Sequence, residues 1–210
     1  MTTVFFARHG ESEANTAHTF ANRGPGSGLT GQGRRQAAEL ASRLASRLAA
    51  SGARELHSSP LARCTETAAI VGAAIGLPVV VRDELREYDV GHLEGQSGAA
   101  AQEEYWDLQR RWLLGSEWDA RHPGGESYRE IVGRLAAYVE SVRSGPVIAV
   151  THGGLLRMAL PRIAADFPPA ESLGRLIPNG GLLELRCDGP AAGVSDRDRR
   201  AGRGCSLQPW

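Results

Sequence analysis

The sequence predicts an α/β protein with a doubly wound, mainly parallel sheet and helices on both of its faces. Short apolar runs alternate with longer segments of helical periodicity, which is the order typical of parallel sheets. Basic residues follow several of these runs directly, at the points where strands are expected to end. At 210 residues, of which 41% are hydrophobic and 23% charged, the chain fits one domain with a sizeable core.

The expected elements follow from the spacing of apolar residues. Strands are predicted at residues 4–7, 55–57, 79–81, 147–150 and 182–185, and the valine run at 79–81 is expected to be buried. Helices are predicted at residues 30–50, 58–75, 99–114, 126–143 and 153–164. Thr30 is a suitable N-cap for the first helix. Pro60 suits the first turn of the second helix, and Gly76 its end.

One domain is expected to cover residues 1–188. From residue 189 onward, Gly, Pro, Arg and Asp dominate without periodicity, so residues 189–210 are predicted to be a disordered tail. The N-terminal segment has no basic region or cleavage signal of a secretory leader. No run reaches the roughly 18 apolar residues of a membrane helix. The sequence therefore predicts a cytoplasmic protein without a membrane partner.

The charged residues exclude several classes of protein. All 24 basic residues are arginine, and 24 acidic residues balance them. No global field therefore attracts nucleic acid or an anionic membrane, and any anion site must be local. Because the chain has no lysine, the lysine-dependent phosphate loop GxxxxGK(S/T) is excluded.

Cysteine and histidine spacings argue against metal or disulfide chemistry. The three cysteines, Cys64, Cys187 and Cys205, are odd in number and unclustered, which predicts neither a disulfide framework nor a zinc knuckle. Neither HxH nor HExxH occurs, and no GxSxG elbow follows a strand. We therefore expect no metal, no cofactor and no serine nucleophile.

Three of the expected strand ends carry residues suited to bind an anion. These are Arg8-His9-Gly10, the segment from Ser58 to Arg63, and Thr151-His152-Gly153-Gly154. The carboxyl ends of parallel strands line the crevice where ligands bind, and helix N-termini there offer free amides. Two arginines and two histidines converging on this crevice would neutralise a phosphate dianion and leave an imidazole nucleophile beside it.

The segment RHGESEAN at residues 8–15 resembles the signature of the histidine phosphatase (phosphoglycerate mutase-like) superfamily. The resemblance continues in the family's order with LTxxG at 29–33, SSPxxRxxxTA at 58–68, ExxxGxxEG at 87–95, PGGES at 123–127 and THGG at 151–154. It spans about residues 3–186. It implies a single histidine phosphatase-like domain with a small helical insertion over the site at about residues 96–125, which contains Trp106, Trp112 and Trp118.

The resemblance implies a role for each matching position. His9 would attack phosphorus and carry a phosphohistidine intermediate, since a neutral imidazole is a competent nucleophile. Arg8, Arg63 and His152 would bind the phosphoryl oxygens, because catalysis of phosphoryl transfer depends mainly on electrostatic stabilisation of the transition state. Glu87 would protonate the leaving alkoxide and then deprotonate water.

Weaker assignments complete the expected site. Asn15 and Gly153 would contribute amides to the phosphate, while Ser12 and His92 are candidates for binding the substrate. Glu84 is a rival to Glu87, but Glu87 has the family's spacing to Gly91 and Glu94-Gly95.

The implied activity is a metal-independent phosphomonoester phosphatase acting on a small phosphorylated metabolite. A phosphoglycerate-type mutase using the same site is the first alternative, and an inactive phospho-ligand-binding protein is the second. Mutases of the family usually carry tryptophan where this chain has Ala14, and their middle insertion is longer. Both departures favour hydrolysis. The substrate and the oligomeric state stay open.

Overall fold

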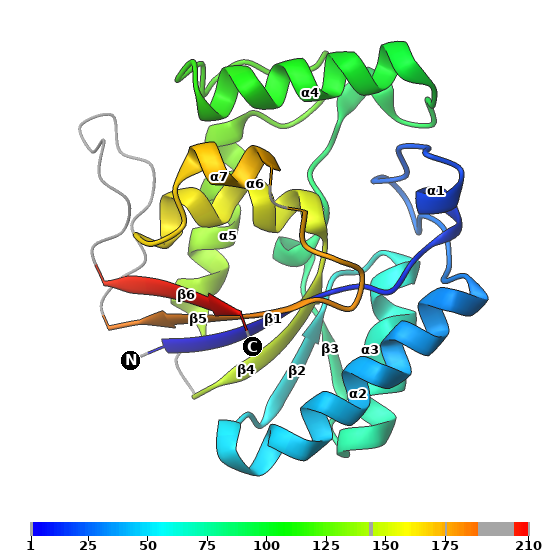
Figure 1. Ribbon diagram of the computed structural model, residues 1–210, viewed down its shortest axis with the longest axis vertical. Coiled ribbons are helices and arrows are strands. Elements are labelled where there is room, and N and C mark those ends of the chain that lie inside the picture. Colours follow the sequence, from blue (N-terminus) through cyan, green and yellow to red (C-terminus); the bar gives the residue numbers. More distant parts are fainter. Residues whose placement is uncertain (1, 143–144, 175, 189–203, 210) are drawn as a thin grey trace.

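The protein forms a six-stranded sheet covered by helices, described here from a computed structural model for residues 2–142, 145–174, 176–188 and 204–209 (Figure 1). The strand order is β3-β2-β4-β1-β5-β6. The strands are β1 (Thr2–Arg8), β2 (Glu55–Ser58), β3 (Val79–Val81), β4 (Val147–Thr151), β5 (Leu182–Cys187) and β6 (Cys205–Pro209). Strands β3, β2, β4 and β1 pair in parallel, whereas β5 and β6 are antiparallel to their neighbours. The predicted α/β, mainly parallel single-domain fold is confirmed.

Helices lie on both faces of the sheet, as expected (Figure 1). Helices α2 and α3 cover one face, and α5 and α6 cover the other. The helices are α1 (Glu13–Thr16), α2 (Gly31–Ser51), α3 (Ala62–Ile75), α4 (Ala99–Leu113), α5 (Tyr128–Ser141), α6 (Gly153–Ile163) and α7 (Pro169–Gly174), with short 3-10 turns at Asp83–Leu85 and Gly91–Leu93. Helix α4 lies across the top of the molecule in Figure 1, beyond the strand ends.

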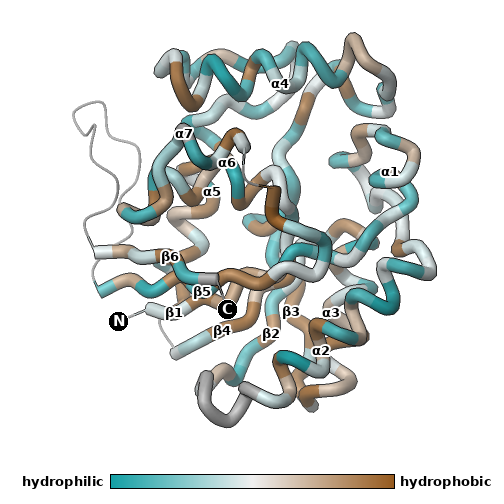
Figure 2. Tube along the Cα trace, in the orientation of Figure 1, coloured by the Kyte–Doolittle hydropathy of each residue, from teal (hydrophilic) through white to brown (hydrophobic). Residues whose placement is uncertain are grey.

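Alternating residues of β1 supply the two layers of the core. Val4 and Phe6 pack with residues of α5 and α6, whereas Phe5 and Ala7 pack with residues of α2 and α3. Successive strand residues point to opposite faces, so a strand in the middle of a doubly covered sheet must be apolar throughout. The tube of α2 alternates hydrophobic and hydrophilic segments (Figure 2), because only one side of this helix faces the sheet.

Local signals in the sequence set the ends of two helices. The Thr30 hydroxyl accepts a hydrogen bond from the Gly33 amide at 3.0 Å, which is the N-cap interaction predicted for α2. Gly76 ends α3 in the left-handed conformation, with φ of 72°. Helix α3 begins at Ala62, so Pro60 precedes the helix and does not occupy its first turn.

The prediction of a buried strand at residues 79–81 is wrong in one respect. Residues 79–81 form β3, but β3 lies at the edge of the sheet and leaves Val80 42% and Val81 54% exposed. An apolar run identifies a strand without showing how many neighbours the strand has.

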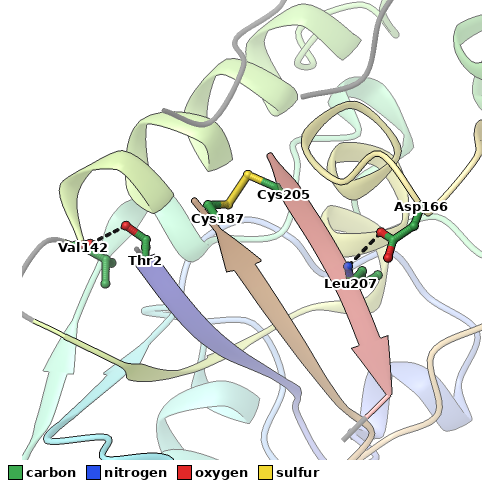
Figure 3. Close-up of a disulfide and its surroundings, with 6 residues drawn as sticks. All are labelled: Thr2, Val142, Asp166, Cys187, Cys205 and Leu207. Carbon is green, nitrogen blue, oxygen red and sulfur yellow. Dashed lines mark hydrogen bonds between the residues drawn. A yellow bond between two sulfur atoms is a disulfide. The ribbon is translucent and has the colours of Figure 1, made fainter. Parts of the chain in front are cut away.

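The expected disordered tail and the expected lack of a disulfide are both wrong for residues 204–209. Strand β6 pairs with β5 and places Cys205 opposite Cys187, and these two residues form a disulfide (Figure 3). The Asp166 carboxylate also accepts a hydrogen bond from the Leu207 amide. Local composition carries no information about this pairing across the sheet. Residues 189–203, the rest of the expected tail, lie outside the described residues.

The disulfide bears on where the protein works. Disulfides persist mainly in oxidising compartments, so this one counts against the cytoplasmic location expected from the sequence.

Within the described ranges, no helix has the length and apolar composition needed to cross a bilayer.

The disulfide predicts a thiol count. Denatured under non-reducing conditions, the protein should show one titratable thiol, that of the buried free Cys64, and three after reduction. Replacing Cys187 and Cys205 by serine should lower the free energy of unfolding by about 3 kcal/mol, because the bond closes a loop with a sequence separation of 18. Three thiols before reduction would contradict the pairing.

Candidate active site

The parallel pairing of β1, β4 and β2 brings the three segments that are expected to bind an anion to one edge of the sheet. Arg8 pairs with Thr151, and Ser58 pairs with Val150. Beyond the strands, the His9 amide donates to the Thr151 carbonyl and the Ser59 amide to the Val150 carbonyl, each at 3.0 Å. The side chains that follow the three strands therefore start from neighbouring positions.

A cavity of about 230 Å³ opens at this edge. Its wall combines the end of β1 and His9 with Glu87, with residues from segment 12–22, from α3, α4 and α6, and with Leu176 and Ile177. Seven residues expected in the site line it: Arg8, His9, Ser12, Asn15, Arg63, Glu87 and Gly153. Glu84, the rival acid, is not among the lining residues.

Hydrogen bonds define the tautomer of His9. Its Nδ1 lies 2.6 Å from the Gly10 carbonyl oxygen, which can only accept, so Nδ1 carries the proton. Arg63 donates from Nε to Nε2 of His9 at 3.2 Å, which requires a lone pair on Nε2. His9 therefore presents an unprotonated Nε2 at an arginine-lined cavity, as a nucleophilic imidazole must.

Burial and nearby guanidinium groups keep this imidazole neutral. Desolvation lowers the pKa of His9 well below its ordinary value, and the charges of Arg63 and Arg8 lower it further. His152 is fully buried behind the cavity wall, with ring centroids of the two histidines 5.2 Å apart. Its Nε2 lies 2.7 Å from the Ser59 hydroxyl, and burial again lowers its pKa. His152 thus adjoins His9 without lining the cavity.

Glu87 reaches the cavity across the start of α6. Its carboxylate accepts hydrogen bonds from the amides of Gly154 at 3.0 Å and Tyr88 at 3.1 Å. A Cβ atom at position 154 would lie 2.6 Å from Oε2 of Glu87, so only glycine permits this approach. Burial raises the pKa of Glu87 above its ordinary value, against the opposing charge of Arg63. A carboxyl group in this state can donate a proton.

The two expected phosphate-binding arginines are held in different ways. Arg8 donates from Nη1 to the Ile177 carbonyl at 2.5 Å, while its buried Nε has no partner. Arg63, 4% exposed, bonds to the Ala21 carbonyl and the Asn22 side chain as well as to His9. Both guanidiniums therefore stand beside His9 in a low-dielectric setting, where they attract an anion strongly.

Ser12 and Asn15 organise the loop between His9 and α1. The two residues form a reciprocal capping box at the start of α1. The Asn15 side-chain oxygen also accepts a hydrogen bond from Asn179 at 3.3 Å. None of the hydrogen bonds formed by the described residues uses the amide nitrogen of the Asn15 side chain, which is the atom expected to reach a phosphate. Gly153, the first residue of α6, lines the cavity as expected.

His92 lies outside the cavity, contrary to its expected place in the site. It contacts Glu104 at 3.0 Å, and Glu104 also contacts His122 at 3.2 Å. The donor atoms of these three residues lie within 4.8 Å of one another, close enough to hold a metal ion, and no other such group occurs among the described residues. None of the three lines the cavity. Gly91, with φ of 62°, begins the 3-10 turn Gly91–Leu93 that carries His92.

Several lining residues were not identified from the sequence. Helix α4 contributes Gln102, Tyr105 and Trp106, and α6 contributes Arg157. Of the tryptophans expected in the insertion, Trp106 lines the cavity, whereas Trp112, 1% exposed, is a core residue. Arg157 follows Gly153 by four residues and so lies on the same side of α6, a spacing that could have indicated it.

Known proteins resemble this chain in sequence. Residues 4–195 match the family model of the histidine phosphatase superfamily (branch 1). The bifunctional protein Rv2228c of Mycobacterium tuberculosis is 35% identical over 169 residues, which cover 79% of this chain and 44% of that protein. The chain thus spans less than half the length of that relative. A protein of Proteus mirabilis named probable phosphoglycerate mutase GpmB is 36% identical over 159 residues, covering 73% of this chain and 70% of that protein.

Solved structures share the fold. A mycobacterial glucosyl-3-phosphoglycerate phosphatase superposes with a TM-score of 0.77 at 22% identity, covering 100% of this chain and 98% of that one. A phosphoserine phosphatase from Entamoeba histolytica gives a TM-score of 0.72 at 21% identity, covering 93% of this chain and 96% of that one. At these identities the likeness concerns the fold alone.

The neutral histidines predict how stability depends on pH. Unfolded, His9 and His152 bind a proton with pKa near 6.5, whereas in the folded protein their pKa values are well below this. The unfolded state therefore binds more protons below pH 6.5, and stability falls as the pH drops. Between pH 7.0 and pH 5.5, the free energy of unfolding measured in urea should decrease by about 1 kcal/mol for each of these histidines. The raised pKa of Glu87 acts in the opposite direction but is a single group.

The variant His9→Asn isolates the contribution of His9 to the pH dependence of the free energy of unfolding. Its loss of stability between pH 7.0 and 5.5 should be smaller than that of the wild type by about 1 kcal/mol. An equal loss in both proteins would mean that His9 is not held neutral.

Proposed function

The chain belongs to the histidine phosphatase superfamily (branch 1), and from this premise we propose that it hydrolyses a small phosphomonoester through a phosphohistidine formed on His9. The observation that carries the proposal is the unprotonated Nε2 of His9, which accepts a hydrogen bond from Arg63 in a cavity lined by Arg8 and Arg63, while the hydrogen bond from Nδ1 to the Gly10 carbonyl fixes the tautomer. Nucleophile, anion-binding groups and a buried acid occur within one wall.

In the first step, Nε2 of His9 attacks phosphorus while the bond to the leaving oxygen breaks. The Gly10 carbonyl stabilises the charge that develops on the imidazole, because it accepts from Nδ1. Glu87 gives its proton to the leaving oxygen, for which its raised pKa suits it. The alcohol product departs and a phosphohistidine remains.

In the second step, water attacks the phosphohistidine. Glu87, now a carboxylate, takes a proton from the water, and the nitrogen–phosphorus bond breaks. Inorganic phosphate leaves, and Nε2 regains its lone pair. Splitting one displacement into two lets a single acid–base group act in both directions.

Arginine side chains supply the positive charge that phosphoryl transfer requires. Arg8 and Arg63 flank His9 and would hold the equatorial oxygens, with the amide of Gly153 at the start of α6. His152 supports His9 from behind, and Asn15 would reach the phosphate by turning its side-chain amide. The residues capable of holding a metal, His92, Glu104 and His122, lie off the cavity, so we propose a metal-independent reaction.

A phosphoglycerate-type mutase is the second candidate, favoured by the similarity to the protein named probable phosphoglycerate mutase GpmB. Against it, Ala14 lines the cavity where the family's mutases usually carry tryptophan, which leaves room for water. An inactive phospho-ligand binder is less well supported, because nucleophile, arginines and acid are all present. A panel of phosphomonoesters should therefore release phosphate faster than 3-phosphoglycerate is isomerised, and the reverse order would favour the mutase.

Hydrolysis of 4-nitrophenyl phosphate tests the nucleophile. Activity near pH 6 to 7 should fall by at least about three orders of magnitude in His9→Ala, because the phosphohistidine cannot form. His92→Ala, a matched replacement outside the cavity, should retain wild-type activity. EDTA should leave the wild-type rate unchanged. Full turnover by His9→Ala, or loss of activity in EDTA, would refute the mechanism.

The dependence on the leaving group tests Glu87. Glu87→Gln should lower kcat for an alkyl phosphate by about 10²- to 10⁴-fold, because an alkoxide needs a proton on departure. The effect on the first step with 4-nitrophenyl phosphate, measured as the burst of nitrophenol, should be much smaller, since this leaving group is stable as an anion. Glu84→Gln serves as the control, because Glu84 does not line the cavity. Equal losses for both substrates would argue against proton donation by Glu87.

A further inference from the structure

Arg157 lines the cavity from α6 and belongs neither to the family signature nor to the reaction described above. It is 5% exposed, and its guanidinium stacks on the Trp106 ring at 4.4 Å. Its Nη2 donates to the Gln109 side chain at 2.8 Å and, more weakly, to the Tyr105 hydroxyl at 3.5 Å. Helix α4 thus holds the Arg157 side chain on several sides and fixes its orientation.

This buried cation lacks an acidic partner. No ion pair within the described part of the chain includes Arg157, and its buried Nε makes no hydrogen bond. Both hydrogen bonds of the guanidinium leave from Nη2 and end on neutral groups. Buried charges are normally paired, because desolvation without compensation is costly. An unpaired, oriented guanidinium at a cavity wall therefore has unused capacity for an anion.

A count of charges around the cavity leads to the same conclusion. Arg8, Arg63 and Arg157 line it, whereas the only acidic lining residue among those described is Glu87. His9 is held neutral, and Glu87 is protonated in the state that starts the reaction. A phosphoryl dianion compensates two of the three guanidiniums, which leaves the charge of one.

We propose that Arg157 binds a second anionic group of the substrate, a carboxylate carried by the leaving group. This inference rests on the proposed phosphatase function and deepens it: the preferred substrate is a phosphomonoester of a hydroxy acid. The planar guanidinium fork matches a carboxylate, and the Tyr105 hydroxyl, which accepts from Nη2 of Arg157, lies beside it. The apolar lining residues Phe20, Trp106 and Ile177 suit the carbon skeleton between the two anions.

The test compares two substrates that differ at one group, 3-phosphoglycerate and glycerol 3-phosphate. The wild type should have the higher kcat/KM for 3-phosphoglycerate. In Arg157→Gln, kcat/KM for 3-phosphoglycerate should fall about 10- to 100-fold, the effect of a lost charge-assisted hydrogen bond, and change less than about 3-fold for glycerol 3-phosphate. Because both substrates are measured on one preparation, the ratio is independent of any unfolded fraction.

Arg162 provides a matched control on the same helix. Its guanidinium also stacks on a tryptophan, Trp118, at 4.4 Å, and its Nε is also buried without a partner, but it does not line the cavity. Arg162→Gln should leave the ratio of the two substrates unchanged. Equal losses for both substrates in Arg157→Gln would assign Arg157 to the transferred phosphate and overturn the proposal. So would an unchanged ratio.

A further pair of substrates distinguishes a subsite for a carboxylate from a subsite for a second phosphate group. Selective loss on fructose 1,6-bisphosphate relative to fructose 6-phosphate, without loss on 3-phosphoglycerate, would overturn the carboxylate assignment. If the wild type hydrolyses none of these esters or 4-nitrophenyl phosphate, the proposed function fails. Calorimetric titration of 3-phosphoglycerate and of glycerol 3-phosphate into wild type and Arg157→Gln then tests the subsite by binding affinity, independently of hydrolysis. Selective weakening of 3-phosphoglycerate supports the subsite, and equal affinities overturn it.

Discussion

The backbone ladder that joins β1, β4 and β2 in parallel is the constraint on which the site depends. Parallel strands end at the same edge, so the residues just beyond Arg8, Ser58 and Thr151 emerge together. The ladder continues past the strands through the amides of His9 and Ser59, which fixes the backbone that carries His9 and leads into α3. An apolar core on both faces of the sheet maintains this alignment.

Burial then determines the chemistry of the groups gathered at that edge. The same desolvation lowers the pKa of His9 and raises that of Glu87, so burial favours the neutral form of both the imidazole and the carboxyl group. Arginine keeps its charge under these conditions, which explains why this lysine-free chain can still present a strongly cationic cavity. Cys64, beside His152, is an unreactive neighbour because burial raises its pKa to about 12.

Helix α4 completes the cavity and connects it to α6. Gln109 and Trp106 orient Arg157 through contacts that join residues about fifty positions apart in the sequence. Phe20 and Tyr105, with ring centroids 4.8 Å apart, close the opposite side between segment 12–22 and α4. In the proposed reaction, the insertion would therefore affect which leaving groups the cavity accepts, while the residues at the strand ends would carry out the phosphoryl transfer. This separation lets substrate preference change without altering His9.

The sequence alone determined the α/β fold and the positions of β1 to β5, because these depend on periodicity. It also indicated the cavity residues Arg8, His9, Arg63 and Glu87, through short segments that resemble the family signature. Only the tertiary structure decided which candidates lie together: it placed His92 off the cavity, His152 behind its wall and Arg157 on it. It also paired Cys187 with Cys205 in a segment whose composition suggested disorder. These outcomes follow from contacts between residues distant in the chain, and the free energy of such contacts leaves no local pattern in the sequence.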